Sequence, residues 1–194
     1  MKKSNLVYGV GINDADYAIG KRIEGKLVFC PFYAYWSSML QRCYSAREQE
    51  RYPTYKGCSV CDEWLTFSNF KSWMKEQDWE DKQLDKDLLF KGNKIYSPEK
   101  CIFISGQLNS FTTECDSARG DYPIGVYFNK KAGKFQARCR NPFTKKREHL
   151  GYFDCANKAH EAWRKRKHEL ACQWAEIVEE PRLKQALRNR YKPS

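Results

Sequence analysis

Residues 122–163 read YPIGVYFNKKAGKFQARCRNPFTKKREHLGYFDCANKAHEAW, and this stretch decides the fold of the C-terminal part of the chain. Within it, the segment 134–140 alternates apolar with polar or basic side chains, which is the two-residue period of a half-buried strand. Two further short strands are expected over 124–128 and 147–150, separated from this segment by turn residues. The sequence therefore predicts a three-stranded antiparallel sheet with one apolar face and one basic face.

A helix is expected to follow the sheet and to cover its apolar face. Asp154 is placed to cap the N-terminus of this helix, because a carboxylate there can accept hydrogen bonds from free backbone N–H groups. Glu148 is the exception in the sheet, since the alternation points it toward the apolar side. The apolar stripe expected on the helix consists of Ala159, Ala162, Trp163, Leu170, Trp174 and Ile177.

Positive charge is concentrated in this last third of the chain. Residues 121–194 carry 18 Lys and Arg against 8 Asp and Glu, and the formal net charge of the whole chain is +11. The basic sheet face would present Lys134, Arg138, Arg140 and Arg147. Such a face suits the major groove of double-stranded DNA, where base edges can be read. A basic face that only contacts solvent is the alternative.

These residues resemble the Apetala-type (ethylene-response-factor) DNA-binding domain over about residues 122–175. The matching positions are Gly125, Val126, Gly133, Lys134, Phe135, Ala137, Arg140, Leu150, Gly151, Tyr152, Phe153 and Ala159. The resemblance implies that the sheet lies in the major groove, with Arg140 and Arg147 at positions where family arginines contact DNA. His149 stands where the plant members have a Trp. The predicted nucleic-acid-binding residues are Lys130, Lys131, Lys134, Arg138, Arg140, Arg147 and His149.

The first 120 residues are nearly neutral, with 17 basic and 16 acidic side chains, and they are rich in aromatic residues. Strands are expected over residues 6–12 and 26–29. Two amphipathic helices are expected after them. The apolar face of the first helix consists of Phe32, Trp36, Met39, Leu40 and Cys43, and that of the second consists of Trp64, Phe67, Phe70 and Met74.

The segment 84–101, which reads LDKDLLFKGNKIYSPEKC, contains residue types that are typical of a divalent-metal site. Asp85 and Asp87 occupy alternate positions, Asn93 follows a Gly turn, and the Ser-Pro-Glu segment 97–99 has the composition of a helix start. Oxygen ligands in this pattern could hold Mg²⁺ or Mn²⁺, whose bound hydroxide would attack phosphorus. A surface turn or an ion pair that holds the fold is the alternative.

The same stretch resembles the HNH nuclease motif over residues 84–109. Lys86 stands where that family has its general-base histidine, and Lys100 stands where the family helix has an Asn. Lys86 is a poor general base, because the adjacent carboxylates raise its pKa. In the catalytic hypothesis Asp85 and Asp87 hold the metal, Lys86 stabilises the developing charge, and Asn93 completes the site.

Cys58 and Cys61 have the two-residue spacing of a zinc knuckle. The chain has no second Cys-x-x-Cys pair, so Zn²⁺ would need distant ligands such as Cys30, Cys43 or Cys101. Two half-buried thiols are the alternative. The nine cysteines are odd in number and scattered, so reduced thiols are expected rather than a disulfide framework.

The whole arrangement resembles phage-encoded proteins that join an HNH-like domain to an Apetala-type domain, over about residues 30–178. The matching positions in the first domain are Trp36, Met39, Arg42, Cys43, Tyr44, Cys61, Asp62, Glu63, Trp64, Phe67, Phe70, Asp85, Lys86 and Asp87. The expected fold class is α+β, with a small aromatic-rich HNH-like (ββα-metal-like) domain followed by a three-stranded antiparallel sheet packed on one helix. The expected parts are N-terminal strands (1–29), the HNH-like domain (30–112), a linker (113–121), the DNA-binding domain (122–178) and a basic tail (179–194).

Two functions fit these features. One is a homing-type endonuclease of double-stranded DNA, and the other is a DNA-binding protein without catalysis. The second could be a phage regulator or an inhibitor of a host defence nuclease, in which case a host defence protein is a further partner. RNA binding is disfavoured, because the basic face is predicted to lack exposed paired aromatic residues.

Neither a membrane span nor a secretion signal is expected. No apolar run approaches the length of a membrane span, and the first residues lack an apolar signal core. The expected location is the cytoplasm of a phage-infected bacterial cell. The sequence does not determine the oligomeric state.

Overall fold

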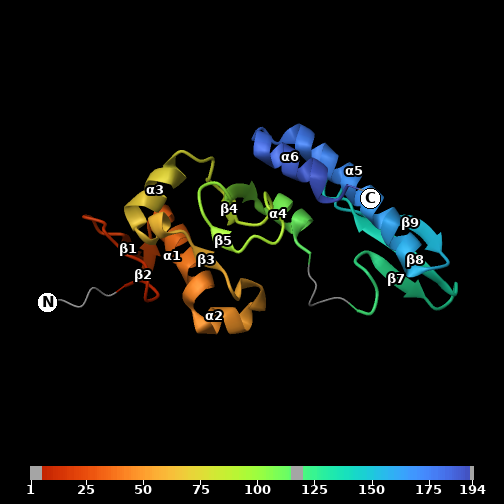
Figure 1. Cartoon of the computed structure of the whole chain (residues 1–194), viewed down its shortest axis with the longest axis horizontal. Coiled ribbons are helices and arrows are strands. Elements are labelled where there is room, and N and C mark those ends of the chain that lie inside the picture. The colour runs from red at the N-terminus through yellow and green to blue at the C-terminus, as the bar shows by residue number, and fades with distance from the viewer. Residues whose placement is uncertain (1–5, 115–119, 193–194) are drawn as a thin grey trace. The chain divides into compact units, whose positions relative to one another are not determined.

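The computed structural model describes residues 6–114 and 120–192, and the chain forms two compact units, Met1–Ser105 and Gly106–Ser194. The described ranges contain six α-helices and four small sheets, which confirms the α+β class (Figure 1). The first unit ends at Ser105, whereas the sequence places the end of the first domain at residue 112. Most of the predicted linker 113–121 lies outside the described residues, which exclude 115–119. None of the helices in the described ranges combines the length and apolarity needed to cross a membrane.

The N-terminal unit begins with a hairpin rather than with two separate strands. Strands β1 (Gly20–Ile23) and β2 (Lys26–Phe29) pair antiparallel, so the strand expected over 26–29 is confirmed. The strand expected over 6–12 is wrong. Val7 and Gly11 instead exchange two backbone hydrogen bonds of 2.9 Å, because two residues between them adopt positive φ and reverse the chain.

Helices α1 and α3 supply the two apolar faces expected from the sequence. The helical elements of this unit are α1 (Pro31–Tyr44), α2 (Ala46–Arg51), η1 (Pro53–Tyr55), η2 (Asp62–Leu65) and α3 (Phe67–Lys75). Helix α1 starts on a proline, whose missing N–H is not needed at the first helical position. Trp64 belongs to η2, so the second predicted helix is split into a 3₁₀ turn and α3.

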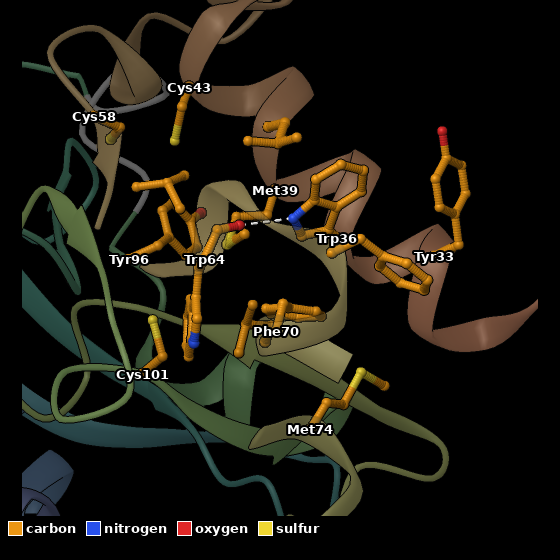
Figure 2. Close-up of a cluster of buried hydrophobic side chains, with 14 of the residues drawn as sticks. Tyr33, Trp36, Met39, Cys43, Cys58, Trp64, Phe70, Met74, Tyr96 and Cys101 are labelled. Carbon is orange, nitrogen blue, oxygen red and sulfur yellow. Dashed lines mark hydrogen bonds between the residues drawn. The ribbon is translucent and has the colours of Figure 1, made fainter. Parts of the chain in front are cut away.

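These faces meet in an aromatic core, shown in Figure 2. Trp36 and Trp64 are both completely buried, and the indole Nε1 of Trp36 donates a 2.7 Å hydrogen bond to the backbone oxygen of Trp64. Phe67 and Phe70 pack beside them and are also buried. Trp36, Trp64, Phe67 and Phe70 therefore pack the core of this unit.

Short strands complete the N-terminal unit. They are β3 (Ser59–Val60), parallel to β5 (Ile95–Tyr96), and β4 (Lys82–Asp85), antiparallel to β6 (Ile102–Ser105). The helix start predicted at 97–99 is wrong, because this segment forms a single turn. The carbonyl of Ser97 accepts hydrogen bonds from the N–H groups of Lys100 and Cys101, and the chain then enters β6.

The C-terminal unit contains the three-stranded antiparallel sheet that the alternation predicts. Its strands are β7 (Val126–Asn129), β8 (Lys134–Arg140) and β9 (Arg147–Phe153), in that spatial order. Helix α5 (Ala156–Ile177) lies across one face of this sheet (Figure 1). Ala137 and Ala159 are fully buried where the sheet and the helix meet.

Two details of α5 differ from the prediction. Asp154 is not the N-cap; that position is Cys155, and Asp154 instead forms an ion pair of 3.3 Å with Lys134. Ile177 does not join the buried stripe, since it lies in the last turn and is 59% exposed. The stripe residues Ala159, Trp163, Leu170 and Trp174 are buried as expected, and Ala162 is partly buried.

The C-terminal unit also includes helices α4 (Gly106–Thr112) and α6 (Pro181–Arg190). The Glu180 carboxylate caps α6 by accepting a 2.7 Å hydrogen bond from the Leu183 N–H. Leu183, Leu187 and Tyr191 are buried. The segment expected as a basic tail is therefore a short helix over Pro181–Arg190, and it is fixed by apolar contacts.

Candidate nucleic-acid interface

The sheet face opposite α5, which we call the open face, carries the basic side chains of β8 and β9. All seven of the predicted nucleic-acid-binding residues are exposed. The residues on the two strands are Lys134, Arg138, Arg140, Arg147 and His149, and Lys130 and Lys131 occupy the β7–β8 turn. The structure thus brings together on one hairpin and one sheet face all seven residues that the sequence analysis named.

Two arginines face each other across the two strands. Arg140 lies directly opposite Arg147, and Arg138 lies opposite the imidazole of His149. Like charges such as those of Arg140 and Arg147 repel and destabilise a sheet. No ion pair with an acidic side chain engages these three arginines within the described residues. The open face therefore holds positive charge that an external anion can neutralise.

The β7–β8 turn has a defined backbone. The side-chain oxygen of Asn129 accepts hydrogen bonds from the N–H groups of Lys131 (3.0 Å) and Ala132 (3.1 Å), and Gly133 has a positive φ. Lys130 and Lys131 consequently project from a fixed hairpin tip. Their ammonium groups are suited to phosphate contacts, which position a protein on a duplex without reading sequence.

The open face also carries two exposed tyrosines that the sequence analysis missed. Tyr127 and Tyr152 lie on either side of Gln136 in the register, and they are 53% and 46% exposed. The expectation that this face lacks exposed aromatic residues is therefore wrong. Gln136 itself is only 6% exposed, because these neighbours cover it. The signal was available for Tyr127, which follows buried Val126 at the alternate position of β7.

His149 is held in one orientation on this face. The amide Nε2 of Gln136 donates to Nδ1 of His149 over 2.8 Å, so the neutral ring carries its proton on Nε2. The ring also packs edge-on against Tyr152, with ring centroids 4.9 Å apart. His149 thus presents an oriented N–H donor beside Arg138.

Glu148 points to the α5 side of the sheet, as the alternation predicts, and it has partners there. Its carboxylate accepts two hydrogen bonds from Arg166 on α5, of 2.7 and 3.1 Å, and one of 2.8 Å from the Asn141 amide. The hydrogen bonds from Arg166 and Asn141 hold the pKa of Glu148 below its ordinary value. This arrangement is a bidentate pair of the strong kind.

The same network fixes the β8–β9 loop. The side-chain oxygen of Asn141 accepts hydrogen bonds from the N–H groups of Phe143 (2.9 Å) and Thr144 (3.2 Å). The Asn141 N–H also donates to the carbonyl of Lys146 over 2.9 Å. Arg140 and Arg147 flank this loop, so the network determines their separation.

In the N-terminal unit, the carboxylate of Asp85 is directed at the backbone of its own loop. Its Oδ1 atom accepts hydrogen bonds from the N–H groups of Asp87 (2.9 Å) and Leu88 (2.7 Å). Burial raises the pKa of Asp85, and the charge of Asp87 raises it further. The same chemistry that would suit a metal ligand is thus used to close a turn.

Asn93 and Lys86 are also engaged within this loop. The Asn93 amide donates to the carbonyls of Lys86 and Ile95, both at 2.7 Å. Lys86 is almost fully buried, and its ammonium lies 3.0 Å from a carboxylate oxygen of Asp87. Burial lowers the pKa of Lys86, but the hydrogen bond and charge of Asp87 outweigh burial and leave the pKa raised. Lys86 is therefore a charged ammonium at neutral pH.

This donor set does not fit a divalent cation. One oxygen of Asp85 already accepts two N–H groups, and the ammonium of Lys86 occupies the site beside Asp87. Across the described residues no three His, Cys, Asp or Glu side chains cluster as metal ligands would. The alternative of a fold-holding turn agrees with these contacts, and binding of Mg²⁺ or Mn²⁺ stays a prediction.

Substitutions of Asp85 test whether its carboxylate stabilises the turn that it caps. Asp85→Ala removes the acceptor for two N–H groups, so the free energy of unfolding should fall by about 1–2 kcal/mol. Asp85→Asn keeps a side-chain oxygen at the same position and should preserve stability. Urea unfolding of both variants measures the difference, and equal losses in both would contradict the capping role.

Cys58 and Cys61 flank strand β3, and among the described residues neither of them belongs to a group of three or more potential metal ligands. The Cys58 thiol is buried and contacts the carbonyl of Thr54 at 3.9 Å, while Cys61 is partly buried. Burial raises the pKa of both thiols, which disfavours the thiolate that Zn²⁺ requires. The contacts agree with two thiols in the wall of the core, and a Zn²⁺ site stays a prediction.

Comparison of the chain with known protein families, with curated proteins and with solved structures found no match. The description of the protein therefore rests on its own fold and on the residues of the open face. It is an α+β protein whose C-terminal sheet carries a helix on one side and exposed basic side chains on the other.

Proposed function

We propose that this protein binds double-stranded DNA through the open face of the β7–β8–β9 sheet. The observation that carries the proposal is the juxtaposition of Arg138, Arg140 and Arg147 on neighbouring strands, exposed and without acidic partners among the described residues. A fold does not retain facing like charges for its own stability. A polyanion removes this repulsion on binding.

The dimensions of the sheet favour the major groove as the binding site. Neighbouring strands lie about 4.8 Å apart, so three strands span about 10 Å. The major groove of B-DNA is about 12 Å wide, whereas the minor groove is about 6 Å wide. The open face can therefore enter the major groove with its side chains directed at base edges.

The positions of the cations suggest a division of roles. Arg138, Arg140 and Arg147 lie within the strands, where they can reach guanine O6 and N7. Lys130 and Lys131 lie at the hairpin tip, where phosphates line the groove. His149 adds a single directed donor. In this arrangement the arginines contribute base recognition and the lysines contribute affinity.

Of the two forms of this function, we favour the one without catalysis. Asp85 and Asn93 are hydrogen-bonded to their own loop, and the ammonium of Lys86 neutralises Asp87. These are the residues that the nuclease hypothesis requires as metal ligands and catalytic groups. Roles in phage regulation or in inhibition of a host defence nuclease are compatible with DNA binding alone.

Binding should depend steeply on salt. About six phosphate contacts give a slope of about −0.9 per contact in a plot of log affinity against log salt concentration, which is roughly a 1,000-fold loss between 50 and 200 mM salt. Fluorescence anisotropy with a labelled duplex measures this slope. The same bases as a single strand are the comparison and should bind more weakly, because an unpaired strand offers no major groove.

Two results would contradict the proposal. A duplex affinity that does not change with salt would exclude an electrostatic interface, and tighter binding of the single strand would point to base stacking on Tyr127 and Tyr152. Nicking of supercoiled DNA with Mg²⁺ or Mn²⁺, abolished by EDTA and by Asp85→Asn with Asp87→Asn, would overturn the non-catalytic form alone.

A further inference from the structure

The C-terminal unit contains a pocket of about 370 Å³ beside the β8–β9 loop. Helix α4 contributes Gln107 and Phe111, helix α5 contributes Lys167, and the end of β8 contributes Arg140. Pro142 and Lys145 line it from the loop, with Ser110 from α4. The volume lies in the range of small-molecule sites.

The walls of this pocket are held together by hydrogen bonds within the protein. The side-chain amide of Gln107 donates to the carbonyl of Pro142 over 2.8 Å, which ties α4 to the loop. The Lys167 ammonium donates to the carbonyl of Phe111 over 2.6 Å, which ties α5 to α4. The loop itself is fixed by Asn141. The pocket is therefore formed without a ligand.

The charge of the pocket is positive. Arg140, Lys145 and Lys167 line it, and none of the residues that line it is acidic. The Lys167 ammonium also lies 3.7 Å from the centroid of the Phe111 ring. A carbonyl and an aromatic face stabilise an ammonium less than a carboxylate does. An anion in the pocket would complete the solvation of these three cations.

The environment of Lys167 disfavours the charged form of its side chain. Burial lowers the pKa of Lys167 to about 8. The charge of Glu114 acts in the opposite direction, and that of Arg190 adds to the effect of burial. A bound anion would favour the charged form of Lys167, so binding and protonation are coupled.

The pocket combines these cations with apolar lining. Pro142 and the small exposed part of Phe111 supply apolar surface, and Gln107 and Ser110 supply polar groups beside them. A phosphate attached to a planar base matches this combination. We infer that the pocket binds a nucleoside monophosphate, with its phosphate against Arg140, Lys145 and Lys167 and its base against Phe111 and Pro142. The ligand is either a free nucleotide or the 5′-phosphorylated end of a nucleic acid.

Isothermal titration of the full chain with AMP, adenosine and inorganic phosphate tests this inference. AMP should bind at least tenfold more tightly than either fragment, because both halves of the pocket are then filled. Lys167→Met, which removes the charge but keeps an unbranched apolar chain, should weaken AMP binding at least tenfold. Lys145→Ala, at an exposed loop position, should weaken it as well and leaves the helix packing intact.

The matched control is Lys165→Met, an exposed lysine on the same helix that does not line the pocket. Its AMP affinity should equal that of the unaltered chain. AMP affinity should also fall as the pH rises through about 8, where free Lys167 loses its proton, and this step should vanish in Lys167→Met. The phosphate itself does not titrate there, since its second pKa is about 6.

Competition distinguishes the two sources of the ligand. Displacement of AMP by a 5′-phosphorylated trinucleotide, but not by its 5′-hydroxyl form, assigns the pocket to nucleic-acid ends, and no displacement assigns it to free nucleotides. Unchanged AMP affinity in both Lys167→Met and Lys145→Ala overturns the inference, as does equal affinity for AMP and inorganic phosphate. Duplex binding in Lys167→Met should remain normal, so failure here is separate from failure of the proposed function.

Discussion

Replacing Arg140 and Arg147 together with alanine is expected to lower the affinity for duplex DNA about 100-fold. Each arginine that contacts a base edge or phosphate contributes about 1–3 kcal/mol, and tenfold in affinity corresponds to about 1.4 kcal/mol. The two side chains face each other at the end of β8 and the start of β9, so the variant removes both cations from the end of the open face beside the β8–β9 loop. Anisotropy titrations at a fixed salt concentration give the ratio of dissociation constants.

The matched control is Lys158→Ala with Lys165→Ala, which removes the same charge from exposed positions on α5. This variant should lose less than about threefold in affinity, because α5 lies on the opposite side of the sheet. A loss as large as that of the arginine variant would mean that net charge, and not the open face, governs binding. Removal of two facing like charges should not lower the free energy of unfolding.

Gly125→Ala is expected to produce the largest loss of stability in the C-terminal unit, about 3 kcal/mol or more. Gly125 has a φ of +81°, and a Cβ atom there would lie 2.1 Å from the Cδ1 atom of Trp163. Trp163 is buried and stacks on His160, so it cannot move without disturbing the packing of α5. Backbone strain and overpacking each cost about 1–3 kcal/mol.

Gly133→Ala is the control that isolates backbone strain. Gly133 also has a positive φ, of +63°, but nothing lies within 4 Å of an added Cβ atom. This variant should lose only about 1 kcal/mol. Denaturant unfolding followed by tryptophan fluorescence compares the two, and equal losses would show that contact with Trp163 does not matter.

Local periodicity was sufficient to predict β8, because its side chains alternate between the α5 side and the open face, where Gln136 alone of the β8 residues is buried. It also selected the exposed cations and the inward position of Glu148. The same reasoning failed on residues 6–12, where alternating apolar residues form a turn, because the positive φ values that reverse the chain leave no trace in hydrophobicity. Tyr152 was missed for a related reason. A bulge shifts the register of β9 against β8, so the face occupied by Tyr152 cannot be counted from Arg147.

The candidate site in the N-terminal unit shows a different limit. A carboxylate that binds a metal and one that caps a turn are the same residue in the sequence. The direction of the Asp85 side chain depends on which backbone N–H groups the following loop leaves free. Likewise, the pocket around Lys167 joins residues from positions 107 to 167, and no local pattern connects them.

The hydrogen bonds of Asn141 and Glu148 have a consequence for the thermodynamics of recognition. A binding loop that orders only on contact loses conformational entropy at that moment, and this loss weakens the complex. Here the backbone between Arg140 and Arg147 is already ordered in the free protein by contacts to α5. Only the rotamers of the two guanidinium side chains remain to be fixed, at about 0.5–1.5 kcal/mol each. Association should therefore proceed without a slow rearrangement of the sheet, and its rate should follow the electrostatic attraction between the partners.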